Sequence, residues 1–329
     1  MSAALRIGVA GAGKWGMNVV RSCAKLGVLA AVCDADLHPL EEVRGRYEGV
    51  RVFCDYETML RLARPDAVIV AAPVPAHAEM ALQAIAAGIP VLVEKPLALN
   101  VGDAQRVVDT ARAAGVPLAV GHVLLYHPLV RLMLQTIREG RIGDVRHFRS
   151  RRASWGRLRA HEDVWWSFAP HDVAVMLEVF GEEPATVTAG AGAYVRPHIA
   201  DLTYADFGFS LGRTAHVEVT WIDPDKTSRF DVFGSRGVLS FTDGAQPRLT
   251  LTPCGDRLGT RGEPELWREE TMALDAPAAE PLLTEIEAFC SAIGGGPALP
   301  TPGEEGLAVV RTLARVHEYP STPRLEAIS

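Results

Sequence analysis

The sequence predicts an α/β protein in two parts: an N-terminal Rossmann-type, doubly wound parallel sheet and a C-terminal α+β region with a largely antiparallel open sheet. Short apolar runs alternate with helical patterns through the first third of the chain. This alternation is typical of βαβ units. Beyond about residue 121 the pattern changes to apolar strands with few helices between them.

The first part shows the regular succession of strands and helices that a parallel sheet requires. Gly27, Gly88 and Gly115 each stand behind a helical pattern, where glycine ends helices. Asp55 and Asn100 are expected to cap helix starts. The expected strands are residues 5–10, 30–33, 50–53, 67–71, 91–93 and 118–120, and the helices are 14–26, a short one after Asp55, 76–87 and 100–114. We therefore expect a dinucleotide-binding domain over residues 1–121.

The second part, residues 122–329, is expected to bind substrate and to mediate oligomerisation. Gly234 to Gly237 lies between two apolar runs and predicts a hairpin turn. Residues 258–281 are rich in Gly, Pro and Glu and predict a loop. The expected helices are 129–139, one from about 171 to 180, 282–293 and 304–318, and the expected strands are 187–189, 205–210, 216–221 and 230–233.

Composition excludes several classes of protein. The net charge of −7 gives no basis for binding a polyanion, so no nucleic-acid partner is expected. Five cysteines show no CxxC pair or metal-ligand spacing, so we expect reduced thiols and no metal. The start lacks the features of a signal peptide, and no apolar run approaches the roughly 20 residues that span a bilayer. We expect a cytoplasmic protein without a membrane partner.

A glycine motif follows the first strand and opens the first helix. Gly11, Gly13 and Gly16 form a GxGxxG pattern that encloses Lys14 and Trp15. In this position the first glycine allows a tight turn, the second lets a pyrophosphate approach and the third permits close helix packing. The motif predicts binding of a dinucleotide, with a glycine-rich turn without ligand as the alternative.

Asp34 ends the second strand, about twenty residues after the glycines. A carboxylate there can accept both ribose hydroxyls of adenosine and repels a 2′-phosphate. Asp34 therefore favours NAD over NADP, although Arg44 or Arg46 could offset the repulsion. The alternative is an ordinary turn residue at the end of a strand.

The sequence Glu94-Lys95-Pro96 follows an apolar strand at the carboxyl edge of the expected sheet. With the glycine motif, and with Pro73 and His77 after the fourth strand, it resembles the glucose-fructose oxidoreductase / inositol dehydrogenase family, called Gfo/Idh/MocA, over almost the whole chain. The resemblance implies that Lys95 contacts the reacting sugar hydroxyl, that Glu94 lies near the nicotinamide ribose and that the bond before Pro96 is often cis. His77 is expected to pack against the cofactor edge. Independently, an ammonium beside the hydroxyl would stabilise negative charge that develops on oxygen.

Residues 167–172 align with the family segment that carries the catalytic histidine. His171 matches that histidine, whereas Ser167 replaces the aspartate that precedes it by four residues. We expect His171 to take the hydroxyl proton without this carboxylate. Asp172 is expected to cap the helix start, with substrate contact as the alternative. The resemblance places His122 and Tyr126 near the sugar.

An arginine-rich run from Arg149 to Arg159 contains Arg157, and guanidinium groups match phosphate oxygens. This run resembles the subgroup that oxidises nucleotide-activated N-acetylglucosamine at C3, so Arg157 and Arg159 are expected to bind a diphosphate. The alternative is a solvated or oligomer-facing strand edge.

The expected function is NAD-dependent oxidation of C3 of an NDP-hexose, giving a 3-keto sugar that an aminotransferase could consume. A ketoreductase of deoxysugar synthesis, a dehydrogenase of free sugars or inositols, and a non-catalytic NAD-binding regulatory protein are the alternatives. The resemblance implies a homodimer or homotetramer.

Overall fold

The chain, in this computed structural model, is described over residues 5–156, 158–159 and 162–317, and it divides into two compact units. The first unit joins Met1–Tyr126 with Ala279–Arg311, and the second joins His127–Ala278 with Thr312–Ser329. From the sequence, all residues from 122 onward were expected to belong to the second domain. In the structure a C-terminal segment returns to the first unit, because an apolar helix from that segment completes the core there.

The first unit is built on a six-stranded sheet with the order β3-β2-β1-β4-β5-β6, in which each neighbouring pair is parallel. This order is the doubly wound Rossmann arrangement. Strands β1, β4, β5 and β6 are buried throughout, as expected of a parallel sheet covered on both faces. The strands are β1 Ile7–Ala10, β2 Leu29–Cys33, β3 Arg51–Phe53, β4 Ala67–Val70, β5 Val91–Glu94 and β6 Leu118–Gly121.

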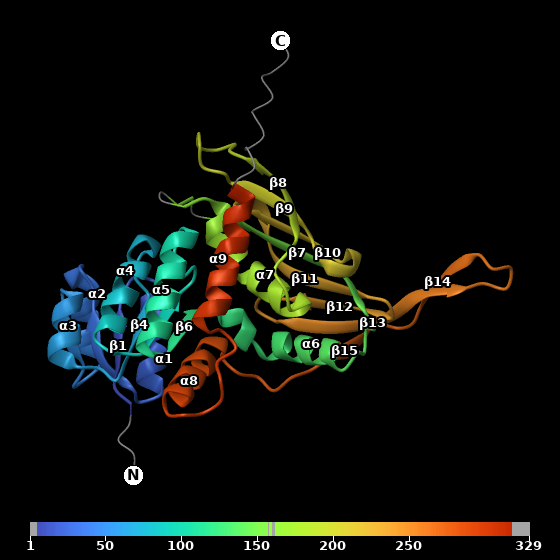
Figure 1. Cartoon of the computed structure of the whole chain (residues 1–329). Coiled ribbons are helices and arrows are strands. Elements are labelled where there is room, and N and C mark those ends of the chain that lie inside the picture. Colours follow the sequence, from blue (N-terminus) through green and yellow to red (C-terminus); the bar gives the residue numbers. More distant parts are fainter. Residues whose placement is uncertain (1–4, 157, 160–161, 318–329) are drawn as a thin grey trace. The chain divides into compact units, whose positions relative to one another are not determined.

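Helices connect these strands and cover the sheet (Figure 1). Asp55 and Asn100 cap α3 and α5 as expected. One further helix, α2, was not expected from the sequence; the side chain of Asp36 caps it by accepting the N–H of His38 at 3.0 Å. The helical segments are α1 Gly16–Lys25, α2 Leu37–Arg46, α3 Tyr56–Ala63, η1 Val74–Ala76, α4 His77–Ala86, α5 Val101–Ala114, η2 Val123–Tyr126 and α8 Pro281–Ile293, while α9 Gly303–His317 contributes to both units.

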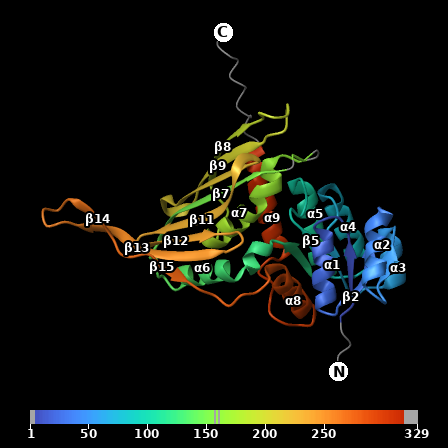
Figure 2. The same ribbon diagram turned by 180° about the vertical axis from the view of Figure 1, so that it is seen from behind.

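The second unit is built on a large mixed sheet, with the order β14-β13-β12-β11-β7-β10-β9-β8 and with β15 beside β13. Only β7 and β10 run parallel among the pairs in the described residues, so the sheet is largely antiparallel as expected. Helices α6 Pro128–Arg138 and α7 Val164–Phe180 pack on one face of this sheet (Figure 2). The strands are β7 Val145–Trp155, β8 Thr186–Gly192, β9 Leu202–Gly208, β10 Thr214–Thr220, β11 Ile222–Gly234, β12 Gly237–Thr242, β13 Arg248–Leu258, β14 Pro264–Arg268 and β15 Met272–Leu274, with a short helical turn, η3 Ser210–Gly212.

Two local expectations for this unit were wrong, and the expected hairpin turn was right. The expected loop over residues 258–281 contains β14 and β15, and the β13–β14 hairpin extends beyond the rest of the sheet (Figure 1). Helix α7 begins at Val164 rather than near residue 171. The hairpin turn between Gly234 and Gly237 is confirmed, since β11 and β12 pair antiparallel across it. Across residues 5–156, 158–159 and 162–317 there is no helix both long and apolar enough to cross a bilayer.

Candidate active site

The glycine motif forms the turn between β1 and α1. Gly11 has a φ of +98°, and a side chain there would lie 2.5 Å from the backbone of Ala71. A side chain at Gly16 would clash with the carbonyl oxygen of Gly11, whereas the position at Gly13 faces open space. These positions require glycine for conformation, for packing and for approach of a ligand, respectively. The open position lies at the start of α1, where helix N–H groups attract phosphate.

Asp34 follows β2 and is held against this turn. Its Oδ2 accepts the N–H of Ala12 at 2.6 Å, and its Oδ1 accepts the N–H of Asp36 at 2.9 Å. An ionised carboxylate has about four acceptor positions, so each oxygen can still accept a ribose hydroxyl. The position and the chemistry of Asp34 therefore fit the adenosine half of a dinucleotide.

Trp15 connects the glycine turn to the end of β5. Lys14 and Trp15 are both exposed, and the Trp15 indole N–H donates to Oε1 of Glu94. The carboxylate of Glu94 is buried and also accepts the backbone N–H of Lys95 at 3.3 Å. Burial raises the pKa of Glu94, while the Trp15 hydrogen bond and the charge of Lys95 act in the opposite direction.

His77 has a structural role that the sequence analysis did not foresee. Its Nδ1 lies 2.9 Å from the carbonyl oxygen of Pro96, and its Nε2 lies 2.8 Å from that of Ala72. The ring is buried, and burial lowers the pKa of His77. The ring lies between the segment after β4, which includes Pro73, and the segment after β5, and a neutral imidazole donates its one N–H to one of these two carbonyl oxygens. The Lys95–Pro96 bond is cis, as the resemblance implied.

His122 and Tyr126 lie in the first unit, not at the start of a substrate domain. The buried ring of His122 places Nδ1 2.6 Å from Oε2 of Glu305, and its Nε2 is buried without a hydrogen-bond partner among the residues that the structure describes. The buried hydroxyl of Tyr126 lies 2.9 Å from Oγ1 of Thr301. Both side chains therefore have contacts with the C-terminal segment that returns to this unit.

In the second unit, α7 carries both Ser167 and His171. Asp163 caps the helix by accepting the N–H of Trp166 at 3.0 Å. The helix continues through Pro170, so Ser167 and His171 lie one turn apart on one face rather than before a helix start. Ser167 is buried and His171 is partly exposed.

Asp172 was expected to cap a helix start, and this expectation was wrong because Asp163 caps α7 and Asp172 lies within it. Its carboxylate is completely buried within α7, where it accepts Nε–H of Arg152 at 2.7 Å and the hydroxyl of Ser150. The side chain of Arg152 is 14% exposed. Asp172 is therefore the acceptor of a buried ion pair that joins α7 to β7, next in sequence to His171.

The arginine-rich run lies mainly on β7 and is neutralised locally. Arg149 pairs with Asp231 at 2.8 Å, and Arg151 pairs with Glu218 at 2.9 Å on the neighbouring strand β10. Arg159 is exposed and its Nε lies 3.1 Å from Glu162. Arg157 lies outside the described residues. Ion pairs, to neighbouring strands for Arg149 and Arg151 and to α7 for Arg152, thus neutralise these arginines of β7.

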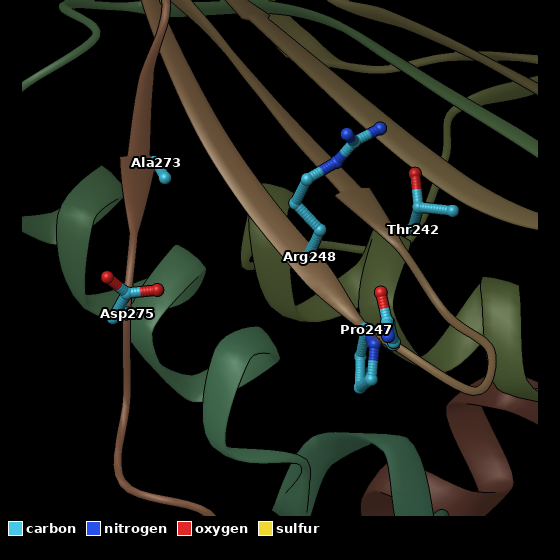
Figure 3. A pocket seen from close by; sticks show the side chains of 6 residues that line it. Thr242, Pro247, Arg248, Ala273 and Asp275 are labelled. Carbon is cyan, nitrogen blue, oxygen red and sulfur yellow. The ribbon is translucent and has the colours of Figure 1, made fainter.

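A surface pocket in the second unit contains none of the site residues expected from the sequence. It is formed by the β12–β13 turn and by β15, and it offers an arginine at the start of β13 and an aspartate directly after β15 (Figure 3). Its lining residues are Thr242, Gln246, Pro247, Arg248, Ala273 and Asp275.

Sequence reasoning missed one buried acid in the first unit, Glu285. This residue is completely buried on α8, between Leu282 and Phe289 on the same face. Spacings of three and four residues place these side chains together on a helix, so an acid at this position in an apolar stretch was a usable signal.

Comparison with known proteins agrees with this geometry. Residues 5–122 match the oxidoreductase family with an NAD-binding Rossmann fold, and residues 130–240 match the GFO/IDH/MocA C-terminal domain. UDP-N-acetylglucosamine 3-dehydrogenase from Acidithiobacillus ferrooxidans is 28% identical over 88% of both chains. Inositol 2-dehydrogenase 2 from Saccharopolyspora erythraea is 31% identical over 65% of this chain and 66% of its own. A crystal form of the Acidithiobacillus enzyme superposes with a TM-score of 0.83 and 26% identity, covering 95% of this chain and 96% of that one.

The sheet order, the glycine turn and the acid after β2 define an NAD-binding Rossmann domain, and hence a nicotinamide-dependent oxidoreductase. The chain belongs to the Gfo/Idh/MocA family, an oxidoreductase family that acts on CH–OH groups and includes sugar and inositol dehydrogenases. The expected class of enzyme, fold and cofactor are confirmed.

Proposed function

We propose that this enzyme oxidises the C3 hydroxyl of a nucleoside-diphosphate hexose to a 3-keto sugar, with NAD as the hydride acceptor. The similarity to UDP-N-acetylglucosamine 3-dehydrogenase carries the proposal, because that alignment extends over 88% of both chains. The aligned inositol dehydrogenase covers 65% of this chain. Lys95 and His171, which match the lysine and the histidine of the family pattern, support oxidation of a hydroxyl in either case.

In the proposed reaction the C–H hydride leaves the carbinol carbon and the hydroxyl proton goes to a base. Bound NAD supplies the acceptor for the hydride. Lys95 stabilises the negative charge that develops on the hydroxyl oxygen. His171 accepts the proton through its imidazole, the side chain that most often serves as a general base. Ser167 stands where the family pattern has an aspartate, and its hydroxyl cannot replace that carboxylate as the group behind His171.

Further residues complete the proposal. Asp34 selects NAD through the adenosine ribose, and Glu94 and Pro96 contribute to the nicotinamide side of the cofactor site. Arg159, together with Arg157, is proposed to contact the diphosphate. A homodimer or homotetramer, a cytoplasmic location and a partner aminotransferase belong to the same proposal. All five cysteines are free thiols, which is consistent with a reducing compartment.

A dehydrogenase of inositol or of a free sugar is the second candidate. The 31% identity to inositol 2-dehydrogenase 2 favours it, as does the local neutralisation of Arg149 and Arg151, which leaves fewer groups for a diphosphate. A ketoreductase of deoxysugar synthesis would favour NADPH and fits Asp34 less well. The substitution at Ser167 motivates a non-catalytic regulatory role, against which Lys95 and His171 both argue.

One experiment separates these candidates. The protein is mixed with NAD and with UDP- or dTDP-hexoses, free sugars or inositols, and absorbance of the reduced nicotinamide is followed. An aminotransferase with its amino donor removes keto product, so that an unfavourable equilibrium cannot conceal activity. The proposal expects turnover with NDP-hexoses that Lys95→Ala abolishes while NAD binding is retained. Turnover with inositols or free sugars alone would favour the second candidate, and NAD binding without any turnover would favour the regulatory role.

A further inference from the structure

Two buried carboxyl groups in the first unit have unequal surroundings. Glu94, at the end of β5, is 6% exposed, and Glu285, on α8, is 0% exposed. Glu94 accepts two N–H groups, from the Trp15 indole and from the Lys95 backbone. Both oxygens of Glu285 are buried without a hydrogen-bond partner among the residues that the structure describes. Only Glu94 is therefore supplied with donors that stabilise a negative charge.

The packing of α8 fixes Glu285 in this position. Leu282, Ile286 and Phe289 share the buried side of α8 and belong to the same hydrophobic core as β1 and α1. Helix α8 packs against α1 and η2, and Figures 1 and 2 both show α8 beside α1. Glu285 cannot turn to solvent without withdrawing this apolar face from the core.

The charges around the two acids locate the proton. An ionised Glu285 would be a buried charge without compensation, near a second carboxylate. Burial raises the pKa of Glu285 well above its ordinary value, and the negative charge of Glu94 raises it further. The charged groups that face Glu94 are Lys95 and His122, which favour its ionised form, and His122 is in turn held by Glu305. Burial raises the pKa of Glu94 too, but its two N–H donors and the neighbouring positive charges oppose that rise, whereas no donor among the described residues opposes it at Glu285. Glu94 is therefore the acid that is charged and Glu285 the one that keeps the proton.

We propose that Glu94 and Glu285 form a carboxylate–carboxylic acid pair that holds one proton at neutral pH, on Glu285, and sets the charge at the nicotinamide half of the cofactor site. Strands β4 to β6 form the second mononucleotide-binding half of this sheet, and Glu94 ends β5 within it. The oxidised nicotinamide ring is positive and the reduced ring is neutral. One negative charge therefore favours the oxidised cofactor, and loss of the Glu285 proton strengthens that preference.

The protonation state can be measured directly in the full-length protein. Protein labelled with ¹³C at the glutamate side-chain carboxyls is examined by infrared spectroscopy near neutral pH. We expect a protonated carboxylic acid band in the wild type, its loss in Glu285→Gln, and its retention in Glu287→Gln, an exposed control two residues further along α8. A wild-type spectrum without this band, or a band that survives in Glu285→Gln, would overturn the proposal.

The functional consequence is tested with cofactor alone, so the result does not depend on the identity of the substrate. Dissociation constants for NAD⁺ and NADH are measured at a series of pH values from about pH 6 to pH 9. In the wild type, the dissociation constant for NADH divided by that for NAD⁺ should rise with pH. The rise can reach about tenfold for each pH unit between the pKa of the pair with NAD⁺ bound and its pKa with NADH bound. Glu285→Gln should flatten this rise and Glu287→Gln should not. Equal pH dependence in all three proteins would contradict the proposed role.

Discussion

Removal of the Asp172 carboxylate should destabilise the second unit, because it leaves Arg152 as a buried charge. Asp172 is 0% exposed, the Arg152 side chain is 14% exposed, and Nη2 of Arg152 is already buried without a partner among the described residues. Breaking such a pair by removing one member typically costs about 3–5 kcal/mol. We expect this loss for Asp172→Ala. Asp172→Asn should lose about 2–3 kcal/mol, since an amide oxygen still accepts one hydrogen bond.

Urea unfolding followed by tryptophan fluorescence measures this loss in the relevant unit. Five of the six tryptophans, all except Trp15, lie in the second unit. Glu218→Gln is a matched control, because it removes one of the two acidic partners of Arg151 on the exposed face of the same strand, where a pair contributes at most about 1 kcal/mol. The double variant Arg152→Met/Asp172→Leu removes both charges and should recover most of the stability. A free energy of unfolding for Asp172→Ala within about 0.5 kcal/mol of the wild-type value would refute this account of the pair.

Three further predictions concern the cofactor and the substrate. Asp34→Ser should narrow the preference for NAD over NADP, because the repulsion of a 2′-phosphate disappears; an unchanged ratio of the two kcat/KM values would assign the selection to another residue. His171→Asn should slow hydride transfer about 10²–10⁴-fold, and Lys95→Ala should also slow it strongly, both with NAD binding retained. Single-turnover kinetics across pH measure the rate of hydride transfer, and a wild-type rate in His171→Asn would exclude His171 as the base. Arg159→Ala should weaken NDP-sugar binding by about 1.5–3 kcal/mol without changing the affinity for NAD. Calorimetric titration with each ligand measures both affinities, and an unchanged affinity for the NDP-sugar would show that Arg159 does not bind the diphosphate.

The Rossmann half was predictable because its determinants are local. Apolar strands, helix-ending glycines and the motif at Gly11 each depend on a few consecutive residues. The GxGxxG spacing and the acid at Asp34 predict the adenosine side because both follow strands of one βαβ unit. The interpretation of Asp34 did not require any contact between distant segments.

The second unit was less predictable because distant partners determine its local structure. Strand β7 was missed because Ser150 and Arg152 occupy inward positions and interrupt the apolar alternation. Both side chains can point inward because they donate hydrogen bonds to the distant Asp172. The segment around Pro170 has the residue types of a helix start, yet the structural cap is Asp163. Strand β14 pairs in a hairpin that exposes Leu258 and Leu266, so no buried apolar pattern marked it.

The return of residues 279–311 to the first unit has a consequence for biosynthesis. Leu282, Ile286 and Phe289 fill the same core as Val9 and Val19, although nearly the whole chain separates them in sequence. A ribosome therefore releases the βαβ segments long before the helix that completes their core is available. The nascent NAD-binding domain must wait with an uncovered apolar face, while the second unit, apart from its last residues, can be synthesised in the interval. Fragments that end before α8 should accordingly aggregate or recruit chaperones, even though they contain the entire six-stranded sheet.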